Sequence, residues 1–344
     1  MLLSVCVIRK TSDVLFIKKL HNDYSVRVIL TPALFFNRIP TMGKEYREIE
    51  YTVKEADGKL TAGEIMRERL MLSSREVSRC KLFDDGVMCK GMLVRIISEL
   101  EPGDVLTVRL YEDIENSSEI VPSDEPIDVV YEDEDLILLN KKGDQVVHPS
   151  YAHYKDSLSN ALAGYYVRTG QEHVMRVIGR LDRETSGLII FAKNRHSASI
   201  LSRKNENMSR RKEYLALCSG IFDEKEGTVD APIERIPGQR MIREVRDDGK
   251  RAITHYKVEK EFKDFSLVRL KLDTGRTHQI RVHMSYLGHP LLGDNLYGKE
   301  IEDNKGLTRA ALHACHLEFE QPITGEKLSF EAELPEDMKT AMGI

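Results

Sequence analysis

The stretch at residues 180–193 places a carboxylate between two arginines, directly before an uninterrupted apolar run. The run at 188–192 is short and continuous, which is typical of a strand buried on both faces. An aspartate between Arg180 and Arg183 stays ionised at neutral pH, because nearby cations favour its charged form. The buried strand behind it would hold that carboxylate rigidly. Asp182 is therefore the leading candidate for a catalytic nucleophile or base; the alternative is an ordinary surface ion pair.

The size and composition of the chain indicate more than one domain. It has 344 residues, and its 41% hydrophobic content is enough to bury a substantial core. Five cysteines are scattered without a Cys-x-x-Cys pair, which argues against a zinc site or a disulfide framework and favours a reducing compartment. No apolar stretch approaches the roughly 18 residues of a membrane span, and the first residues lack a secretory layout. We expect a cytoplasmic protein of two domains without a membrane partner.

The charge is distributed unevenly along the chain. The formal net charge is −5 at pH 7, which is unfavourable for a partner rich in phosphate groups. Basic residues nevertheless gather at 203–212 and 240–251, whereas acidic residues concentrate at 112–135 and 331–337. Such runs permit nucleic-acid binding, although a run of charge is more often a solvated face.

Residues 1–41 differ in pattern from the rest of the chain. They mix phenylalanine, isoleucine and basic residues without clean periodicity, and prolines interrupt them at positions 32 and 40. A polar segment then opens at Met42. We interpret residues 1–41 as an extension ahead of a native start at Met42; the alternative is a short appended pair of strands.

Residues 42–110 indicate a small domain with two helices and a hairpin. Thr61 precedes Glu64 by three residues, which is the capping box that begins a helix, and Ser74 begins a second helix. A hairpin strand is expected at 87–89 and a closing strand at 105–110. This order resembles the RNA-binding module first known from ribosomal protein S-four, although any small α/β domain could show it. The resemblance implies that the second helix faces RNA through Arg75, Arg79 and Lys81. An acidic linker at 111–126 follows.

Two later segments combine regular structure with reactive side chains. The strand at 212–216 alternates, so that Lys212 and Tyr214 share one face. In the segment at 272–298, Thr277 can cap a helix on which His278 and Arg281 share a face near the start. Two histidines five residues apart without a carboxylate ligand between them do not form a zinc motif, so we expect no metal.

The loop at 140–149 and the residue Glu184 are weaker candidates for function. The loop follows a strand and is expected to shape one wall of the pocket, with His148 as a hydrogen-bonding structural residue rather than a proton carrier. Glu184 lies two residues beyond Asp182, which suggests a second hypothesis: the two carboxyl groups act as a catalytic acid and base pair, as in glycoside cleavage. We discount it, because Glu184 sits beside Arg183. Thr185, with the two residues after it, more readily builds the turn that aims Asp182.

Four ordered motifs within residues 127–337 resemble those of the RluA-type pseudouridine synthases, which isomerise uridine in RNA. They are Val-His-Pro at 147–149, Arg-Leu-Asp at 180–182, Lys-Glu-Tyr-Leu-Ala at 212–216 and Gln-Ile-Arg at 279–281. Gly179 and Lys142 depart from the pattern, where members often carry histidine and proline. The resemblance implies an α+β fold: a mixed, mainly antiparallel sheet with flanking helices forms the catalytic domain at 127–344, after the small RNA-binding domain.

The resemblance also implies a role for each main residue. Asp182 is the essential catalytic group, and Tyr214 lies against the target base and removes a proton late in the reaction. Arg281 pairs with Asp182, which we expect to be a charge-assisted bidentate contact. Arg180 braces the gap left when the target uridine leaves its stack. The residues expected to contact substrate in this domain are Arg180, Arg183, Thr185 and His278.

We therefore predict an RNA pseudouridine synthase that needs no cofactor and acts as a monomer on structured RNA. Ribosomal RNA is the expected partner, with transfer RNA as the alternative. One rival is a hydrolase of nucleosides or phosphodiesters that uses Asp182 and His283. The other rival is a non-catalytic RNA-binding or ribosome-assembly factor, whose function would survive the loss of Asp182.

Overall fold

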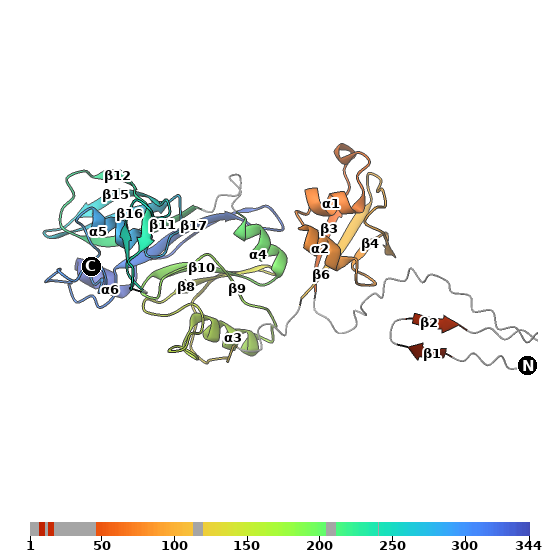
Figure 1. Cartoon of the computed structure of the whole chain (residues 1–344), viewed down its shortest axis with the longest axis horizontal. Coiled ribbons are helices and arrows are strands. Elements are labelled where there is room, and N and C mark those ends of the chain that lie inside the picture. The colour runs from red at the N-terminus through yellow and green to blue at the C-terminus, as the bar shows by residue number, and fades with distance from the viewer. Residues whose placement is uncertain (1–6, 11–12, 17–45, 113–119, 204–210, 240) are drawn as a thin grey trace, which may run out of the picture.

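The computed structural model describes residues 7–10, 13–16, 46–112, 120–203, 211–239 and 241–344 (Figure 1). The first two of these segments form β1 (Val7–Lys10) and β2 (Asp13–Phe16), which pair antiparallel. This pairing corresponds to the alternative interpretation of residues 1–41, a short appended pair of strands. The proposed start at Met42 lies outside the described residues and stays a prediction.

A small unit at residues 46–112 combines a four-stranded sheet with two short helices. The sheet has the order β3-β6-β4-β5, and a 3-10 helix, η1 (Glu55–Asp57), follows its first strand. Its strands are β3 (Tyr46–Thr52), β4 (Val87–Cys89), β5 (Met92–Leu93) and β6 (Val105–Tyr111), and its helices are α1 (Ala62–Glu68) and α2 (Ser74–Cys80). The predicted capping box begins α1: Thr61 accepts a hydrogen bond from the Glu64 amide, and Glu64 accepts one from the Thr61 amide. Whether this unit is an S-four-like domain stays a prediction.

The larger unit, formed by the described residues after 126, is built on a ten-stranded sheet. Its strand order is β12-β15-β16-β11-β17-β10-β8-β7, with β18 paired to β17 and β9 paired to β10. These strands are β7 (Val129–Glu132), β8 (Leu136–Lys141), β9 (Arg176–Ile178), β10 (Ser186–Ala192), β11 (Arg211–Ser219), β12 (Glu226–Asp230), β15 (Ile253–Glu261), β16 (Phe265–Leu272), β17 (Leu312–Glu320) and β18 (Lys327–Glu331). Every pairing within this sheet is antiparallel except β10 with β17.

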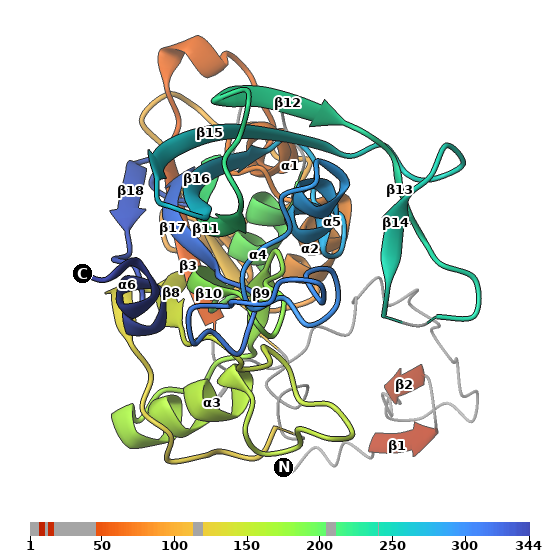
Figure 2. The same cartoon turned by 90° about the vertical axis from the view of Figure 1, so that its left-hand side faces the viewer.

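Four helices and one hairpin surround this sheet. The helices are α3 (Leu158–Thr169), α4 (Arg195–Ser202), α5 (Gln279–Tyr286) and α6 (Glu336–Met342). The hairpin of β13 (Ile233–Arg235) and β14 (Arg243–Val245) projects beyond the sheet (Figure 2). The predicted α+β fold with a mainly antiparallel sheet and flanking helices is confirmed. None of the described helices has the length and apolarity needed to cross a membrane.

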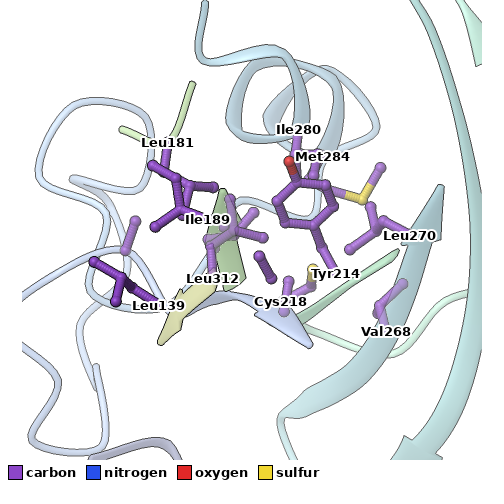
Figure 3. Packing of buried hydrophobic residues seen from close by; sticks show 14 of the residues in the cluster. Leu139, Leu181, Ile189, Tyr214, Cys218, Val268, Leu270, Ile280, Met284 and Leu312 are labelled. Atoms are coloured by element: carbon purple, nitrogen blue, oxygen red, sulfur yellow. The ribbon is translucent and has the colours of Figure 1, made fainter. Parts of the chain in front are cut away.

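Alternation along β11 divides the core of the larger unit into two layers. Tyr214 and Cys218 belong to the largest apolar cluster, in which the Tyr214 ring lies among Ile280, Met284 and Leu270 (Figure 3). Leu217 points to the opposite layer, where α6 packs. The predicted separation of the two faces of this strand is therefore confirmed, and it brings Tyr214 to the side of the sheet on which α5 lies.

The parallel pairing of β10 with β17 brings two backbones unusually close at Gly187. This glycine has φ of +104°, and an added Cβ atom would lie 2.3 Å from the Ala314 carbonyl oxygen. Only glycine fits such an approach. The contact fixes the start of β10, and with it the turn that carries Asp182.

The two units contact each other through charged groups that are largely removed from solvent. Arg47 of β3 donates to both oxygens of Asp135, at 2.7 and 3.0 Å. Glu76 of α2 lies 3.0 Å from Nδ1 of His196 in α4, and both residues are buried. The helix α2 is thus tied to the sheet that carries the candidate site.

Candidate active site

A pocket of about 650 Å³ opens where three segments distant in sequence meet. One wall is the turn between β9 and β10, and the second is the segment from the end of β16 into α5. Lys212 and Tyr214 of β11 form the third. The predicted site residues among its lining are Arg180, Asp182, Thr185, Tyr214, His278 and Arg281. The shared cavity that the proposed chemistry requires is therefore present.

Asp182 is half-buried in this pocket and its carboxylate is unpaired. No hydrogen bond or ion pair joins the carboxylate to any other residue that the structure describes, and only its carbonyl is engaged, by the Thr185 amide at 3.1 Å. Its charge still acts on nearby cations. Burial lowers the pKa of the His278 imidazole, and the Asp182 charge opposes that shift. Asp182 thus lies close enough to His278 to interact with it electrostatically, without a direct partner for its carboxylate among the described residues.

Tyr214 lines the pocket, and its ring packs on apolar side chains. Its side chain is 7% exposed, and its ring packs in the cluster that also contains Leu181 and Ile280. The Lys212 ammonium lies 5.5 Å from the ring centroid, a cation–π contact on the same face of β11. The ring is therefore fixed in position while it still forms a wall on which a flat base could stack.

Arg281 does not form the pair that we expected with Asp182. Its Nε and Nη2 atoms donate to the two oxygens of Asp294, at 2.7 and 2.6 Å, and Nη2 also reaches Glu184 Oε1 at 3.2 Å. Arg281 is 2% exposed, and burial works against its charge, but the Asp294 hydrogen bonds keep its pKa above the ordinary value. The prediction of a bidentate Asp182–Arg281 contact was wrong. Asp294 is fully buried, and leaving its carboxylate unpaired would cost more free energy than leaving the half-buried Asp182 unpaired, so Arg281 pairs with Asp294. Arg281 acts on Asp182 only through space.

Lys141 supports the turn from behind. It is 1% exposed, and its ammonium donates to the carbonyls of Lys142, Gln145 and Arg183 at 2.8, 2.8 and 2.9 Å. Burial, together with the Arg309 charge, lowers the pKa of the Lys141 ammonium to about 7, and the Asp182 charge opposes this. The loop at 140–149 was expected to form a pocket wall, but it does not line the pocket. It lies behind the turn, and Lys141 joins the two.

His278 occupies a strained position at the start of α5. It is the N-cap residue of the helix, where Thr277 was expected, and its φ of +58° is rare for a residue with a side chain. Its Nδ1 atom lies 3.0 Å from the Tyr297 hydroxyl. A strained backbone held by its surroundings is common at functional sites.

Several other candidates are placed away from the pocket. Arg183 is exposed and its Nε donates to Asp144 at 2.7 Å, so it points away from the cavity that Arg180 lines. His148 Nδ1 lies 3.1 Å from Ser159 Oγ, which fits the structural role expected for it. His283 is fully buried between Thr254 and the Ala231 carbonyl and does not line the pocket, which argues against a hydrolase that uses Asp182 with His283.

Of the basic residues predicted on the second helix, Arg75 and Arg79 lie on α2 of the small unit and Lys81 is its C-cap residue, and all three lie outside the pocket. Arg75 and Lys81 are exposed and Arg79 is partly buried. The described residues contain no cluster of His, Cys, Asp or Glu side chains suited to a metal ion.

Sequence reasoning missed two residues that shape the site. Asp294 lies in the same segment as Arg281, at 272–298, and its presence there was a usable signal for an alternative ion-pair partner. Lys141 ends a strand, a position at which lysine is usually exposed, so nothing in the sequence indicated its burial.

Comparison with known proteins identifies the family. Residues 135–286 match the family model for RNA pseudouridylate synthase. The chain is also 39% identical over 287 residues to the uncharacterized RNA pseudouridine synthase YjbO of Bacillus subtilis, with 83% of this chain and 96% of the relative covered. The chain belongs to the RNA pseudouridine synthase family. The predicted family and the predicted isomerase activity are confirmed.

Other pseudouridine synthases match this member over most of its length. It is 35% identical over 303 residues to the ribosomal large subunit pseudouridine synthase D of Vibrio cholerae, with 85% of this chain and 93% of the relative covered. Among solved structures, Human RNA Pseudouridylate Synthase Domain Containing 1 has a TM-score of 0.52 and 28% identity, and the match covers 61% of this chain and 84% of that one.

Proposed function

We propose that this pseudouridine synthase modifies specific uridines of ribosomal RNA, with Asp182 as its catalytic nucleophile. The relatives named ribosomal large subunit pseudouridine synthase D, from Vibrio cholerae and Haemophilus influenzae among others, support the choice of ribosomal RNA over transfer RNA. The observation that carries the assignment of Asp182 is its unpaired carboxylate in a pocket that Tyr214 also lines. We expect the protein to act as a monomer in the cytoplasm.

The reaction needs a carboxylate that is ionised and free. The bond from ribose to the uracil nitrogen breaks, the base turns, and a new bond forms from ribose to a ring carbon. That carbon then loses its proton, and the nitrogen gains one, so the atoms balance without a cofactor. Asp182 can attack the sugar's anomeric carbon, add to the base or draw a proton from the sugar. Each route requires that the carboxylate is ionised and faces the bound nucleotide.

Tyr214 and the pocket walls are assigned the remaining steps. Tyr214 stacks against the base and takes the proton from the new bonding carbon. The apolar side chains behind its ring retain the free uracil and limit water, which would otherwise hydrolyse the intermediate. Arg180, exposed at the rim, braces the RNA where the uridine has left its stack, which costs a few kcal/mol.

We also propose a division of labour between domains: an S-four-like domain at 42–110, an acidic linker at 111–126 and the catalytic domain at 127–344. The exposed Arg75 of α2 and the exposed Lys81 at its C-cap would contact phosphates, together with Arg79. The buried contact of Glu76 with His196 supports this, because it holds α2 in a constant position relative to the sheet that carries the pocket.

Mapping of pseudouridines tests the proposal. Ribosomal and transfer RNA from cells that lack this gene are labelled chemically and compared after complementation with the wild type, Asp182→Asn or Asp223→Asn. Asp223 is an exposed aspartate in the turn between β11 and β12 and serves as the matched control. The wild type and the control should restore specific ribosomal sites, and Asp182→Asn should restore none. Retained modification with Asp182→Asn, or release of free uracil by the wild type, would contradict the proposal.

A further inference from the structure

We infer that Asp337 of the C-terminal helix α6 is a positioning residue for catalysis, which acts through Arg309 on the backbone of the turn that carries Asp182. The inference rests on the proposed role of Asp182. Because the Asp182 carboxylate has no side-chain partner among the described residues, its position depends on the backbone that follows it. Whatever holds residues 183–186 therefore aims the carboxylate.

Arg309 is one of the groups that hold this backbone. Its Nη1 atom donates to the Glu184 carbonyl at 2.8 Å and to the Ala310 carbonyl at 3.1 Å, and Nη2 lies 3.4 Å from Ser186 Oγ. The side chain is 5% exposed. Arg309 thus contacts the turn at two of its residues, one on each side of Thr185.

Asp337 orients this guanidinium from the opposite side. Its two carboxylate oxygens accept from Arg309 Nε at 2.7 Å and from Nη2 at 2.9 Å, which is the planar fork of a bidentate pair. Across the described residues, Asp337 is the carboxylate that forms an ion pair with Arg309. The fork fixes the plane of the guanidinium, so that Nη1 faces the Glu184 carbonyl.

The helix that carries Asp337 is itself fixed to the sheet. Met338 of α6 is fully buried in the cluster that contains Leu215 and Leu217, on the face of β11 opposite Tyr214. Space for Arg309 is also preserved on the other side, because a Cβ atom at Gly143 would lie 2.2 Å from its Nε. A continuous path therefore runs from α6 through Arg309 to the catalytic turn.

Loss of the Asp337 charge should release the Arg309 fork and loosen the turn, while Arg180 and the basic residues of the small unit keep their positions for RNA contact. A misplacement of about 1 Å in a reacting group can lower a rate about 100-fold. We expect Asp337→Asn to lower the single-turnover rate of pseudouridine formation about 10- to 100-fold. Its affinity for the RNA should stay within about twofold, because Arg180 and the small unit are untouched.

The test compares Asp337→Asn with Glu336→Gln, a neighbouring acid of α6 that is exposed and contacts Lys339 at the surface. The control should match the wild type in rate and affinity. Arg309→Met and the double variant Arg309→Met/Asp337→Asn should lose the same rate as each other, since Asp337 acts only through Arg309. Asp337→Glu keeps the negative charge on a longer side chain, so it should recover part of the rate that Asp337→Asn loses. It replaces Asp337→Asn as the test variant if Asp337→Asn does not fold.

Two outcomes would overturn the inference. One is a rate for Asp337→Asn that equals the rate of Glu336→Gln; where Asp337→Asn does not fold, it is a rate for Asp337→Glu that equals the rate of Glu336→Gln. The other is a loss of affinity as large as the loss of rate, which indicates general unfolding instead of positioning. Failure of the proposed function is separate, because then the wild type would form no pseudouridine, or Asp182→Asn would remain active.

Discussion

The two sides of the turn that carries Asp182 differ in how their charges are satisfied. Behind it, Lys141 and Arg309 are each at most 5% exposed, and each donates several hydrogen bonds to carbonyl or carboxylate oxygens. In front, the half-buried Asp182 carboxylate has no such partner among the described residues. A buried charge is tolerated only when it is paired, whereas a carboxylate that faces a pocket can stay free. The rear side therefore serves stability and positioning, and the front side serves chemistry.

The largest effect should come from removing the buried Lys141 side chain behind the turn. Lys141→Met leaves three carbonyls without their donor, and each unsatisfied group costs about 1–3 kcal/mol. We expect the free energy of unfolding to fall by about 3–5 kcal/mol, measured by urea denaturation. Lys142→Met removes a neighbouring lysine that is exposed and should change it by less than about 0.5 kcal/mol. Equal effects of the two variants would show that the rear side is not the stabilising one.

A smaller effect is expected from acid, through His313 on the same rear side. Burial lowers the pKa of the His313 imidazole to about 4, and its Nδ1 atom lies 2.9 Å from Ser186 Oγ. The unfolded chain binds a proton at this position below pH of about 6.5, and the folded protein does so only near pH 4. Stability is therefore fully present above pH of about 6.5 and is lost as the pH falls toward 4.

This dependence is measured by unfolding the protein at several pH values between 7 and 4. His313→Gln should flatten the decline by about 1–3 kcal/mol at the acid end. His173 contributes in the same window, since burial also lowers its pKa to about 4, and it remains in both proteins. An unchanged slope in the variant would rule out His313 as a source of the acid sensitivity.

The helices and strands, and the side of a strand on which a residue lies, were predictable from the sequence because they depend on local residue patterns. The capping box at Thr61 and Glu64 begins α1, and the alternation of β11 places Tyr214 on the pocket side. Reactive residues next to regular elements could be located in this way, and Asp182, Tyr214, His278 and Arg281 do line one cavity.

Partners within the site were not predictable from the same patterns. Arg281 pairs with Asp294 instead of Asp182, because the choice between two carboxylates depends on which one the tertiary structure buries. Lys141 is buried because three carbonyls from different parts of the chain converge on its ammonium, and no local pattern encodes that convergence. The position of the loop at 140–149 behind the turn follows from the same convergence.

The most direct measurement compares the two carboxylates of one turn, Asp182 at the front and Glu184 at the rear. Glu184 accepts from the Ala310 amide at 2.8 Å and contacts Arg281, whereas Asp182 accepts from neither. For Asp182→Asn we expect a loss of about 1,000-fold or more in single-turnover pseudouridine formation, with stability within about 0.5 kcal/mol of the wild type. For Glu184→Gln we expect a stability loss of about 1–3 kcal/mol and a rate within about 10-fold, since Arg309 still holds the Glu184 carbonyl. An equal loss of rate in both variants, or a larger loss of stability with Asp182→Asn, would contradict the account.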